Sequence, residues 1–179
     1  GDPYLIIFCD GSEDAYGACC YVHWKTKDNK TLTRLLVGKS RVTPVKMTTI
    51  VRIELAGALL ASRLYKFIKE ECRLRFAKTF ILTDSQIVFS MIQSESYGFA
   101  TYTAVRVGEM RENSDPATWF SIRGNDNIAD WVSRGKGVVE LCQSGPWQRG
   151  PDFLRLPEED WPLSQLRSTL SLPDKVKVV

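Results

Sequence analysis

The stretch Tyr4-Leu-Ile-Ile-Phe-Cys-Asp10-Gly-Ser12 decides the fold, because an unbroken apolar run ends there in an acid and a turn. Such a run predicts a buried strand over residues 4–10. A second run, Thr79-Phe-Ile-Leu-Thr-Asp84-Ser85, ends in the same way. An acidic side chain at the end of a buried strand is unfavourable unless a cation faces it. The two strand ends therefore predict one shared acidic site.

The segments around these two runs predict a mixed α/β sheet with helices on its faces. Strands are expected over residues 15–24 and 31–38, joined by a polar turn at 27–30, so that the first three strands are antiparallel. Leucines at helical spacing predict a long helix over 50–70. Next come a strand at 79–83, helices at 85–93 and 99–113, and a strand at 117–122. Asn125 or Asp126 is expected to cap a last helix that runs to Arg134 and stops at Gly135.

The composition changes at about residue 140, which divides the chain into a domain over 1–139 and an extension over 140–179. Five prolines after this point interrupt regular structure. Four apolar side chains are spaced as anchors that would pack an irregular extension onto the domain: Trp147, Phe153, Leu154 and Trp161. The chain begins with Gly rather than Met, so we expect a fragment or a processed product.

Charge and cysteine usage narrow the functional classes. The net charge of +3 permits nucleic-acid binding without requiring it. The five scattered cysteines include no C-x-x-C pair, and His23 is the single histidine, which argues against a zinc site. We expect buried, reduced thiols in a reducing compartment and a structural role for His23. No apolar run reaches the ~20 residues of a membrane span, and no signal peptide is visible.

Two further acids complete a set that suits metal-dependent phosphodiester hydrolysis. Glu54 lies near the start of the long helix, and Asp130 is expected about one turn into the last helix. Two Mg²⁺ ions about 4 Å apart can activate water and stabilise a leaving oxygen, and Mg²⁺ prefers oxygen ligands. The small residues on the face of Glu54, namely Gly57, Ala58 and Ala61, would let the helix lie close to the sheet and bring Glu54 near Asp10.

These residues carry a resemblance to ribonuclease H. Four segments are similar to its four motifs in order and spacing: Phe8-Cys-Asp10-Gly-Ser12, Arg52-Ile-Glu54-Leu-Ala56, Leu82-Thr-Asp84-Ser85 and Asn127-Ile-Ala-Asp130. The fuller resemblance is to the ribonuclease H domain of Pao/BEL-type LTR retrotransposon polyproteins. It rests on Arg52 to Leu64, Thr83 to Ser85, Asn127 to Gly135 and the segments Gly145-Pro146-Trp147 and Gly150 to Leu154. It covers about residues 4–162.

The resemblance implies an RNase H-like fold, with a five-stranded mixed sheet in the order 3-2-1-4-5. It implies endonucleolytic hydrolysis of the RNA strand of RNA–DNA hybrids during reverse transcription. Asp10, Glu54, Asp84 and Asp130 would be the catalytic residues and the ligands of two Mg²⁺ or Mn²⁺ ions. The implied partners are the hybrid and an adjacent reverse transcriptase domain of the same polyprotein. The implied location is a virus-like particle in the cytoplasm.

Candidate contacts to nucleic acid follow from position beside the four acids. Gly11, Ser12, Ser85 and Gln86 are candidates for contacts to backbone groups of a hybrid, although Ser12 and Ser85 also suit turn or helix capping. Further candidates are basic: Arg41 and Arg52, with Lys39 and Lys46, as phosphate ligands, and Arg134, which could instead brace its helix end. Many ribonucleases H have a His in the loop before the last helix. Here that loop has Arg123 and Asn125 as its candidate substitutes. Trp131 and Trp147 are expected to pack rather than to stack on bases.

Two kinds of alternative compete with this interpretation. Integrases and transposases need a Glu about 35 residues after the second Asp, and counting on from Asp84 reaches Trp119 and Phe120. Proofreading exonucleases need D-x-E on the first strand, where this chain has Asp10-Gly-Ser12. Both alternatives fail on sequence. A catalytically weak or inactive binding or connection domain of a polyprotein stays open.

Overall fold

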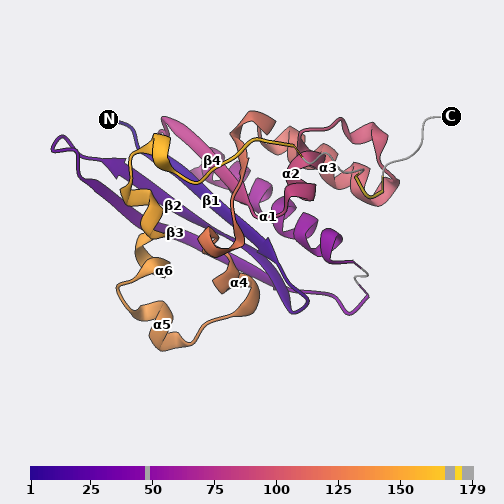
Figure 1. Ribbon diagram of the computed structural model, residues 1–179, viewed down its shortest axis with the longest axis horizontal. Coiled ribbons are helices and arrows are strands. Elements are labelled where there is room, and N and C mark those ends of the chain that lie inside the picture. The colour runs from indigo at the N-terminus through magenta and orange to yellow at the C-terminus, as the bar shows by residue number, and fades with distance from the viewer. Residues whose placement is uncertain (47–48, 168–171, 175–179) are drawn as a thin grey trace.

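One mixed sheet in the order β3-β2-β1-β4-β5 organises the chain, as predicted (Figure 1). The structure is a computed structural model that describes residues 1–46, 49–167 and 172–174. The strands are β1 (Tyr4–Gly11), β2 (Ala15–Lys25), β3 (Thr31–Val42), β4 (Lys78–Thr83) and β5 (Trp119–Ser121). The first three are antiparallel, whereas β4 runs parallel to β1 and β5 runs parallel to β4. The predicted directions of the first three strands are therefore confirmed.

The central strand β1 is buried on both faces, which explains its unbroken apolar sequence. Leu5 and Ile7 belong to one core and Ile6 and Phe8 to the other, because successive side chains of a strand point to opposite faces. The parallel register of β1 and β4 places Cys9 opposite Thr83. The residues that follow these two, both acids, therefore emerge at the same edge of the sheet.

Three helices cover one face of the sheet: α1 (Ile50–Glu71), α2 (Gln86–Ile92) and α3 (Thr101–Asn113). The helix α1 begins after Thr49, whose side chain accepts a hydrogen bond from the Arg52 N–H as an N-cap. Its buried stripe, which includes Leu55 and Leu64, packs against the side chains of β1. The helical spacing of the apolar residues therefore predicted both the helix and its buried face.

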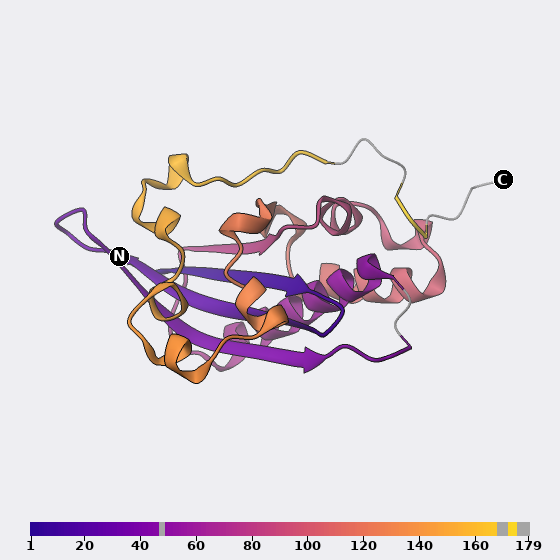
Figure 2. The same ribbon diagram turned by 60° about the horizontal axis from the view of Figure 1, so that its bottom comes forward.

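The opposite face is covered by α4 (Asp130–Arg134) and by the extension after it, so helices lie on both faces as predicted. Phe153, Leu154 and Trp161 of the extension are buried in the same core as Phe8 of β1. Figures 1 and 2 show this orange-to-yellow chain running beside β2 and β3 and then back along the sheet. Residues 168–171 and 175–179 of the extension lie outside the described residues.

The last helix differs from its prediction. It begins at Asp130 rather than near residue 126, and a separate 3₁₀ turn, Gly124–Asp126, precedes it. Neither Asn125 nor Asp126 caps it, since its N-cap is Ala129 and makes no side-chain hydrogen bond. The predicted stop at Gly135 is confirmed, and its φ of 82° suits glycine.

The extension is also more regular than its prolines suggest. It contains α5 (Val138–Cys142), α6 (Pro146–Arg149) and the 3₁₀ turns Asp152–Arg155 and Glu158–Asp160. Pro146 occupies the first position of α6, where a proline lacks no needed hydrogen bond. The prolines therefore start or separate short helical turns instead of abolishing them.

The burial expected of the cysteines holds for three of the five, since Cys72 is half-buried and Cys142 is exposed. All five cysteines are free thiols, and Cys9, Cys19 and Cys20 are buried. His23 is buried on β2, with its Nδ1 atom 2.7 Å from Thr33 Oγ1, which is a structural role. Within the described ranges, no helix is both long enough and apolar enough to cross a membrane.

We expect Phe153→Ala to lower the free energy of unfolding by about 3–5 kcal/mol, because it removes a buried ring from the second core. The ring of Phe153 lies 6.2 Å from that of Phe8, centroid to centroid. Chemical denaturation measures the change, with Leu166→Ala, at an exposed position, as control. An unchanged midpoint in Phe153→Ala would show that the extension does not stabilise the domain.

Candidate active site

An open cleft of about 1030 Å³ lies at the carboxyl ends of β1 and β4. Asp10 is the penultimate residue of β1, and Asp84 directly follows β4. All four acids singled out from the sequence line this cleft: Asp10, Glu54, Asp84 and Asp130. Segments that are up to 120 residues apart in the chain thus contribute carboxylates to one surface.

Glu54 reaches the cleft because α1 touches the end of β1 backbone to backbone. A Cβ atom added to Gly57 would lie 2.6 Å from the Asp10 carbonyl oxygen. A Cβ atom added to Gly11 would lie 2.7 Å from the carbonyl oxygen of Ile53. The close approach predicted from the small residues on this helix face is confirmed at Gly57, and it requires glycine on both elements.

Asp130 enters the cleft as the first residue of α4, not one turn into the helix as expected. Its Oδ1 atom accepts a hydrogen bond of 2.7 Å from Arg134 Nε, one turn further along. Arg134 therefore braces the helix and partly neutralises this carboxylate. Both side chains are well exposed, so the ion pair itself adds little stability.

Ser133 belongs to the site, but the sequence analysis included it only within the segment Asn127 to Gly135 and did not predict a role for it. It is buried, and its hydroxyl donates a hydrogen bond of 2.6 Å to Asp10 Oδ2. Its carbonyl oxygen accepts a hydrogen bond of 2.8 Å from Ser12 Oγ. The β1–β2 turn and α4 are thereby fixed to each other on either side of Asp10. The capping alternative for Ser12 agrees with these contacts, since its hydroxyl serves the turn and the helix.

Asn127 ties the loop before α4 to the end of β1. Its side-chain nitrogen donates a hydrogen bond of 2.9 Å to the carbonyl oxygen of Cys9. Its side-chain oxygen accepts one of 3.1 Å from the Ala129 N–H. Asn127 also lowers the pKa of Asp84, against the larger effect of burial, so it acts on both acidic strand ends. The signal in the sequence was its fixed spacing of three residues before Asp130.

The cleft raises the pKa of three of its acids. Burial is the largest cause of the increase for Asp84, and repulsion from Asp10 is the next, which together raise its pKa to about 7. Burial, opposed by the hydrogen bond from Ser133, also raises the pKa of Asp10. The pKa of Glu54 is raised by burial and by Asp10, against a hydrogen bond with Ser85. Negative charge is therefore unfavourable here without a counter-cation.

The carboxylates of the cleft are suitable ligands for a hard divalent cation, although they do not form a complete coordination sphere. Carboxylate oxygens are the ligands that Mg²⁺ and Mn²⁺ prefer. Within the described part of the chain, however, no three His, Cys, Asp or Glu side chains converge as ligands of one ion. Asp10 and Asp130 each accept one hydrogen bond, from Ser133 and Arg134, at one carboxylate oxygen. A shared cleft of mutually repelling carboxylates still suits Mg²⁺, since this ion keeps several waters and needs few carboxylates.

Four further acids line the same cleft and were not predicted as site residues: Glu13, Asp14, Asp126 and Asp152. Of these, Asp126 was expected only as a possible helix cap. Arg123 Nε lies 3.4 Å from Asp126 Oδ2 without hydrogen-bond geometry. Among the residues that the structure describes, this oxygen is the one buried side-chain N or O atom without a hydrogen bond. The Arg123 side chain is 82% exposed, and its guanidinium group faces Asp126 of its own loop. Arg123 therefore does not line the cleft.

The candidate nucleic-acid contacts divide into two groups. Gly11, Ser12, Asn125 and Arg134 line the cleft with the four acids. Ser85 lies beside it, as the N-cap of α2, and accepts from the Val88 N–H. Its position therefore agrees with the capping alternative.

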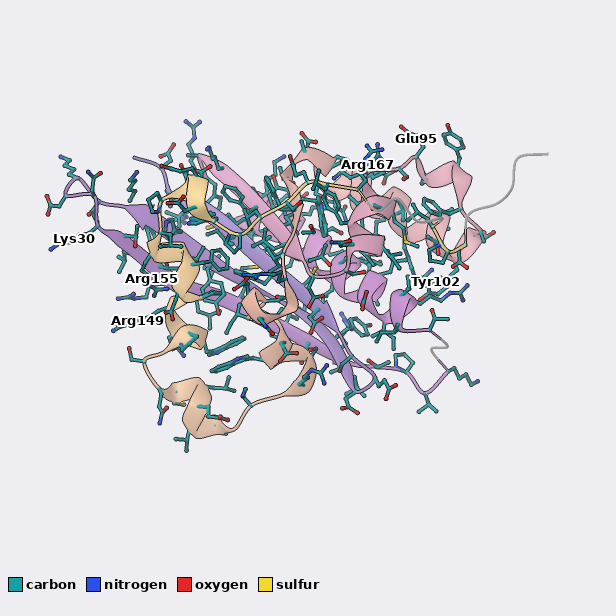
Figure 3. All side chains as sticks on the ribbon, viewed as in Figure 1. Lys30, Glu95, Tyr102, Arg149, Arg155 and Arg167 are labelled. Carbon is teal, nitrogen blue, oxygen red and sulfur yellow. The ribbon has the colours of Figure 1, made fainter. Side chains whose placement is uncertain are left out.

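The other candidates lie away from the cleft lining. Gln86 is exposed on the first turn of α2. Arg41 lines a separate small groove between β2, β3, α1 and α3. Arg52 pairs with Asp174 at 3.2 Å and lies over the ring of Tyr102, which Figure 3 places at the α3 end of the molecule. Arg52 is thus engaged by the extension.

Comparison with known proteins supports the resemblance seen in the motifs. A family model described as "Pao retrotransposon-like RNaseH-like domain" matches residues 2–85, a range that includes Asp10, Glu54 and Asp84. The predicted resemblance is confirmed for that range. Asp130 and the extension lie outside it. No curated protein sequence matches the chain.

Solved structures with a similar arrangement are ribonuclease H domains. The N-terminal RNase H domain of Rv2228c from Mycobacterium tuberculosis, solved as a fusion with maltose binding protein, is 13% identical over 74% of this chain and 92% of its own, with a TM-score of 0.48. RNase H1 from Halobacterium salinarum NRC-1 is 14% identical over 75% and 96%, with a TM-score of 0.42. LC11-RNase H1 in complex with RNA/DNA hybrid is 12% identical over 74% and 94%, with a TM-score of 0.43. Likenesses this distant carry no argument about activity.

We expect Gly57→Ala to lower the free energy of unfolding by about 1–3 kcal/mol, because the new Cβ overlaps the backbone of β1. The matched control is Gly108→Ala in α3, where the nearest atom to an added Cβ is at 3.5 Å. That change should be neutral or stabilise by about 0.5–1 kcal/mol, as alanine does in a helix. Equal behaviour of the two variants in urea denaturation would contradict the close approach of α1.

The raised pKa of Asp84 predicts that stability without divalent cations falls as pH rises. The folded pKa of about 7 exceeds the ordinary value of 3.8, so the folded protein binds this proton more tightly than the unfolded chain. The stabilisation is therefore present at low pH and is lost between about pH 4 and pH 7. Asp84→Asn should flatten this dependence.

The same variant should raise the melting temperature at neutral pH by several degrees, since ~1 kcal/mol shifts the melting temperature of a domain of this size by about 2–4 °C. Thermal melts in a chelator across this pH range measure both effects. Asp28→Asn, in the exposed turn between β2 and β3, is the control. A pH profile of Asp84→Asn that matches the unmodified protein would contradict the electrostatic account.

Proposed function

We propose that this chain, whose residues 2–85 match the Pao retrotransposon-like RNaseH-like family model, is a ribonuclease H. The reaction is endonucleolytic hydrolysis of the RNA strand of RNA–DNA hybrids. The cofactors are two Mg²⁺ or Mn²⁺ ions, with Asp10, Glu54, Asp84 and Asp130 as ligands.

One observation carries the proposal: four carboxylates from β1, α1, the end of β4 and α4 line a single cleft. Burial raises the pKa of Asp10, Glu54 and Asp84, and repulsion from neighbouring carboxylates raises it further. A structural cluster of this kind would be self-repelling, whereas divalent cations relieve the repulsion. The acids are therefore better explained as ligands than as surface charges.

The other residues of the site hold these ligands. The Ser133 hydroxyl orients Asp10 through Oδ2, Arg134 partly neutralises Asp130, and Asn127 fixes the loop to β1. When bound, two divalent ions supply the charge stabilisation that the attacking and leaving oxygens of phosphodiester hydrolysis need. The protein contributes the position and the burial of the carboxylates.

The surroundings of the acids suit a hybrid that is read by shape and by its backbone. Gly11, Ser12, Asn125 and Arg134 offer small groups, hydrogen-bonding groups and one cation beside the carboxylates. Hybrids and RNA duplexes are recognised through phosphates and 2′-hydroxyls rather than base edges. With few cations in the cleft, we expect weak binding that weakens further as salt rises.

The biological setting follows from the family resemblance. We propose that the domain acts in reverse transcription, beside a reverse transcriptase domain of the same polyprotein. The location would be a virus-like particle in the cytoplasm, in agreement with five free thiols. We further propose that residues 1–139 form the catalytic domain and that residues 140–179 form an extension packed on it.

We expect the protein to cleave the labelled RNA strand of an RNA–DNA hybrid in Mg²⁺ or Mn²⁺ and to leave the DNA strand intact. Asp84→Asn should lower the cleavage rate by about 100-fold or more, the equivalent of about 2.7 kcal/mol, because it removes a charged ligand. Circular dichroism and thermal melts show whether the variant keeps its fold.

Metal binding separates an enzyme from an inactive connection domain. Mn²⁺ or Mg²⁺ should raise the melting temperature of the unmodified protein but not that of Asp10→Asn. An inactive connection domain would show no metal response and no cleavage. Cleavage by Asp84→Asn at the unmodified rate would reject the assignment of the site.

A further inference from the structure

The helix α4 carries two residues of the site but has little stability of its own. It spans five residues, from Asp130 to Arg134, and its N-cap makes no side-chain hydrogen bond. Helices this short are not stable in water without tertiary contacts. Since Asp130 lines the cleft from α4 and the buried Ser133 bonds Asp10 from the same helix, the position of the site depends on what holds this helix.

A stacked tryptophan pair links α4 to the extension. The rings of Trp131 in α4 and Trp147 in α6 lie 6.4 Å apart, centroid to centroid, with an angle of 4° between their planes. This is an offset parallel stack, a favourable geometry for aromatic pairs. Lys136 Nζ lies 4.9 Å from the centroid of Trp131 and adds a cation–π contact. Trp131 directly follows Asp130, so the stack acts on the helix at the ligand itself.

Trp147 is itself held firmly against the sheet. The buried Tyr21 of β2 donates a hydrogen bond of 2.8 Å from its hydroxyl to the Trp147 carbonyl oxygen. On β3, Gly38 makes room for the indole, because a Cβ atom added there would lie 3.0 Å from Trp147 Cη2. Figure 1 shows α6 beside β3, and α4 nearer the carboxyl end of β1. Trp147 is therefore a fixed platform on which Trp131 rests.

We propose that Trp147 is a positioning residue of the site: it holds α4 through Trp131 so that Asp130 and Ser133 face Asp10. The extension thereby completes the carboxylate cleft rather than only covering the sheet. The effect on catalysis rests on the proposed function, whereas the bracing of α4 does not.

The consequence of losing the stack follows from the contacts of α4. Ser133 Oγ lies 2.6 Å from Asp10 Oδ2, a distance that a small displacement of the helix would lengthen. Residues that orient metal ligands typically change metal affinity or activity about 10- to 100-fold when they are mutated. The expected defect is thus in the metal concentration that gives half-maximal rate, with little change in the KM for the hybrid.

The test compares Trp147→Ala, which removes the stack, with Trp147→Phe, which keeps an aromatic ring. Amide hydrogen exchange is read at Ser133 and Gly135, whose N–H groups bond within α4. We expect exchange there to be about tenfold faster in Trp147→Ala and near the unmodified rate in Trp147→Phe, in line with the stability that aromatic pairs add. Hybrid cleavage against Mn²⁺ concentration should show at least about a tenfold higher half-maximal concentration for Trp147→Ala.

The matched control is Trp161→Phe, in the same extension but packed on Phe80 and Phe153 rather than on α4. It should lower the melting temperature without changing exchange in α4 or the metal dependence. Tyr21→Phe, which removes the hydrogen bond to Trp147, should speed exchange in α4 and carries the test if Trp147→Ala does not fold.

Two results would overturn the positioning role. One is unchanged exchange in α4 of folded Trp147→Ala or, if that variant does not fold, of Tyr21→Phe. The other is an equal effect of Trp161→Phe. If the unmodified protein cleaves no hybrid while exchange in α4 is faster in Trp147→Ala, the proposed function is wrong but the positioning of α4 by Trp147 is supported.

Discussion

Backbone contact between α1 and the carboxyl end of β1 is the constraint on which the cleft depends. Gly11 and Gly57 face the carbonyl groups of Ile53 and Asp10, and neither leaves room for a side chain. A helix at the usual distance from a sheet would hold Glu54 further from the strand ends. The absence of two Cβ atoms therefore brings a carboxylate of α1 beside Asp10, and the electrostatics of the site follow from that approach.

Bringing these acids together is unfavourable by itself, and the neighbouring residues offset only part of that cost. Ser133, Asn127 and Arg134 each bond a different carboxylate or the backbone beside it. These contacts orient the acids but supply one cation for four carboxylates. Burial, and after it repulsion from Asp10, raises the pKa of Asp84 to about 7 despite these contacts. Strongly perturbed pKa values in a cleft are typical of functional sites.

The extension contributes both to the core and to the position of α4. Its apolar residues Phe153, Leu154 and Trp161 fill the core on the face opposite α1. Trp147 reaches the other end of that face and stacks on α4. The same segment thus stabilises the sheet and positions one edge of the cleft, since both tasks need apolar side chains on one surface.

The sequence by itself determined the strands, the long helix and the four acids, because these rest on local patterns, whereas the sheet order was implied only by the family resemblance. Apolar runs, helical spacing and the acids that end two runs are visible without knowledge of contacts. The sequence also placed Trp131 and Trp147 as packing residues. The predicted start of α4 was wrong, because the Asn127 side chain bonds the Cys9 carbonyl of β1 and the Ala129 N–H and holds the loop before the helix, a pair of contacts that local propensity does not reveal.

Only the tertiary structure decided which candidates share the cleft and how they are held. Arg41 and Arg52 resemble phosphate ligands in sequence, yet one lines a separate groove and the other pairs with Asp174. Ser133 bonds Asp10, which lies 123 residues earlier in the chain. Asp126 lines the cleft although it was not predicted as a site residue. Long-range contacts of this kind depend on how the elements pack in three dimensions, for which a linear pattern carries no signal.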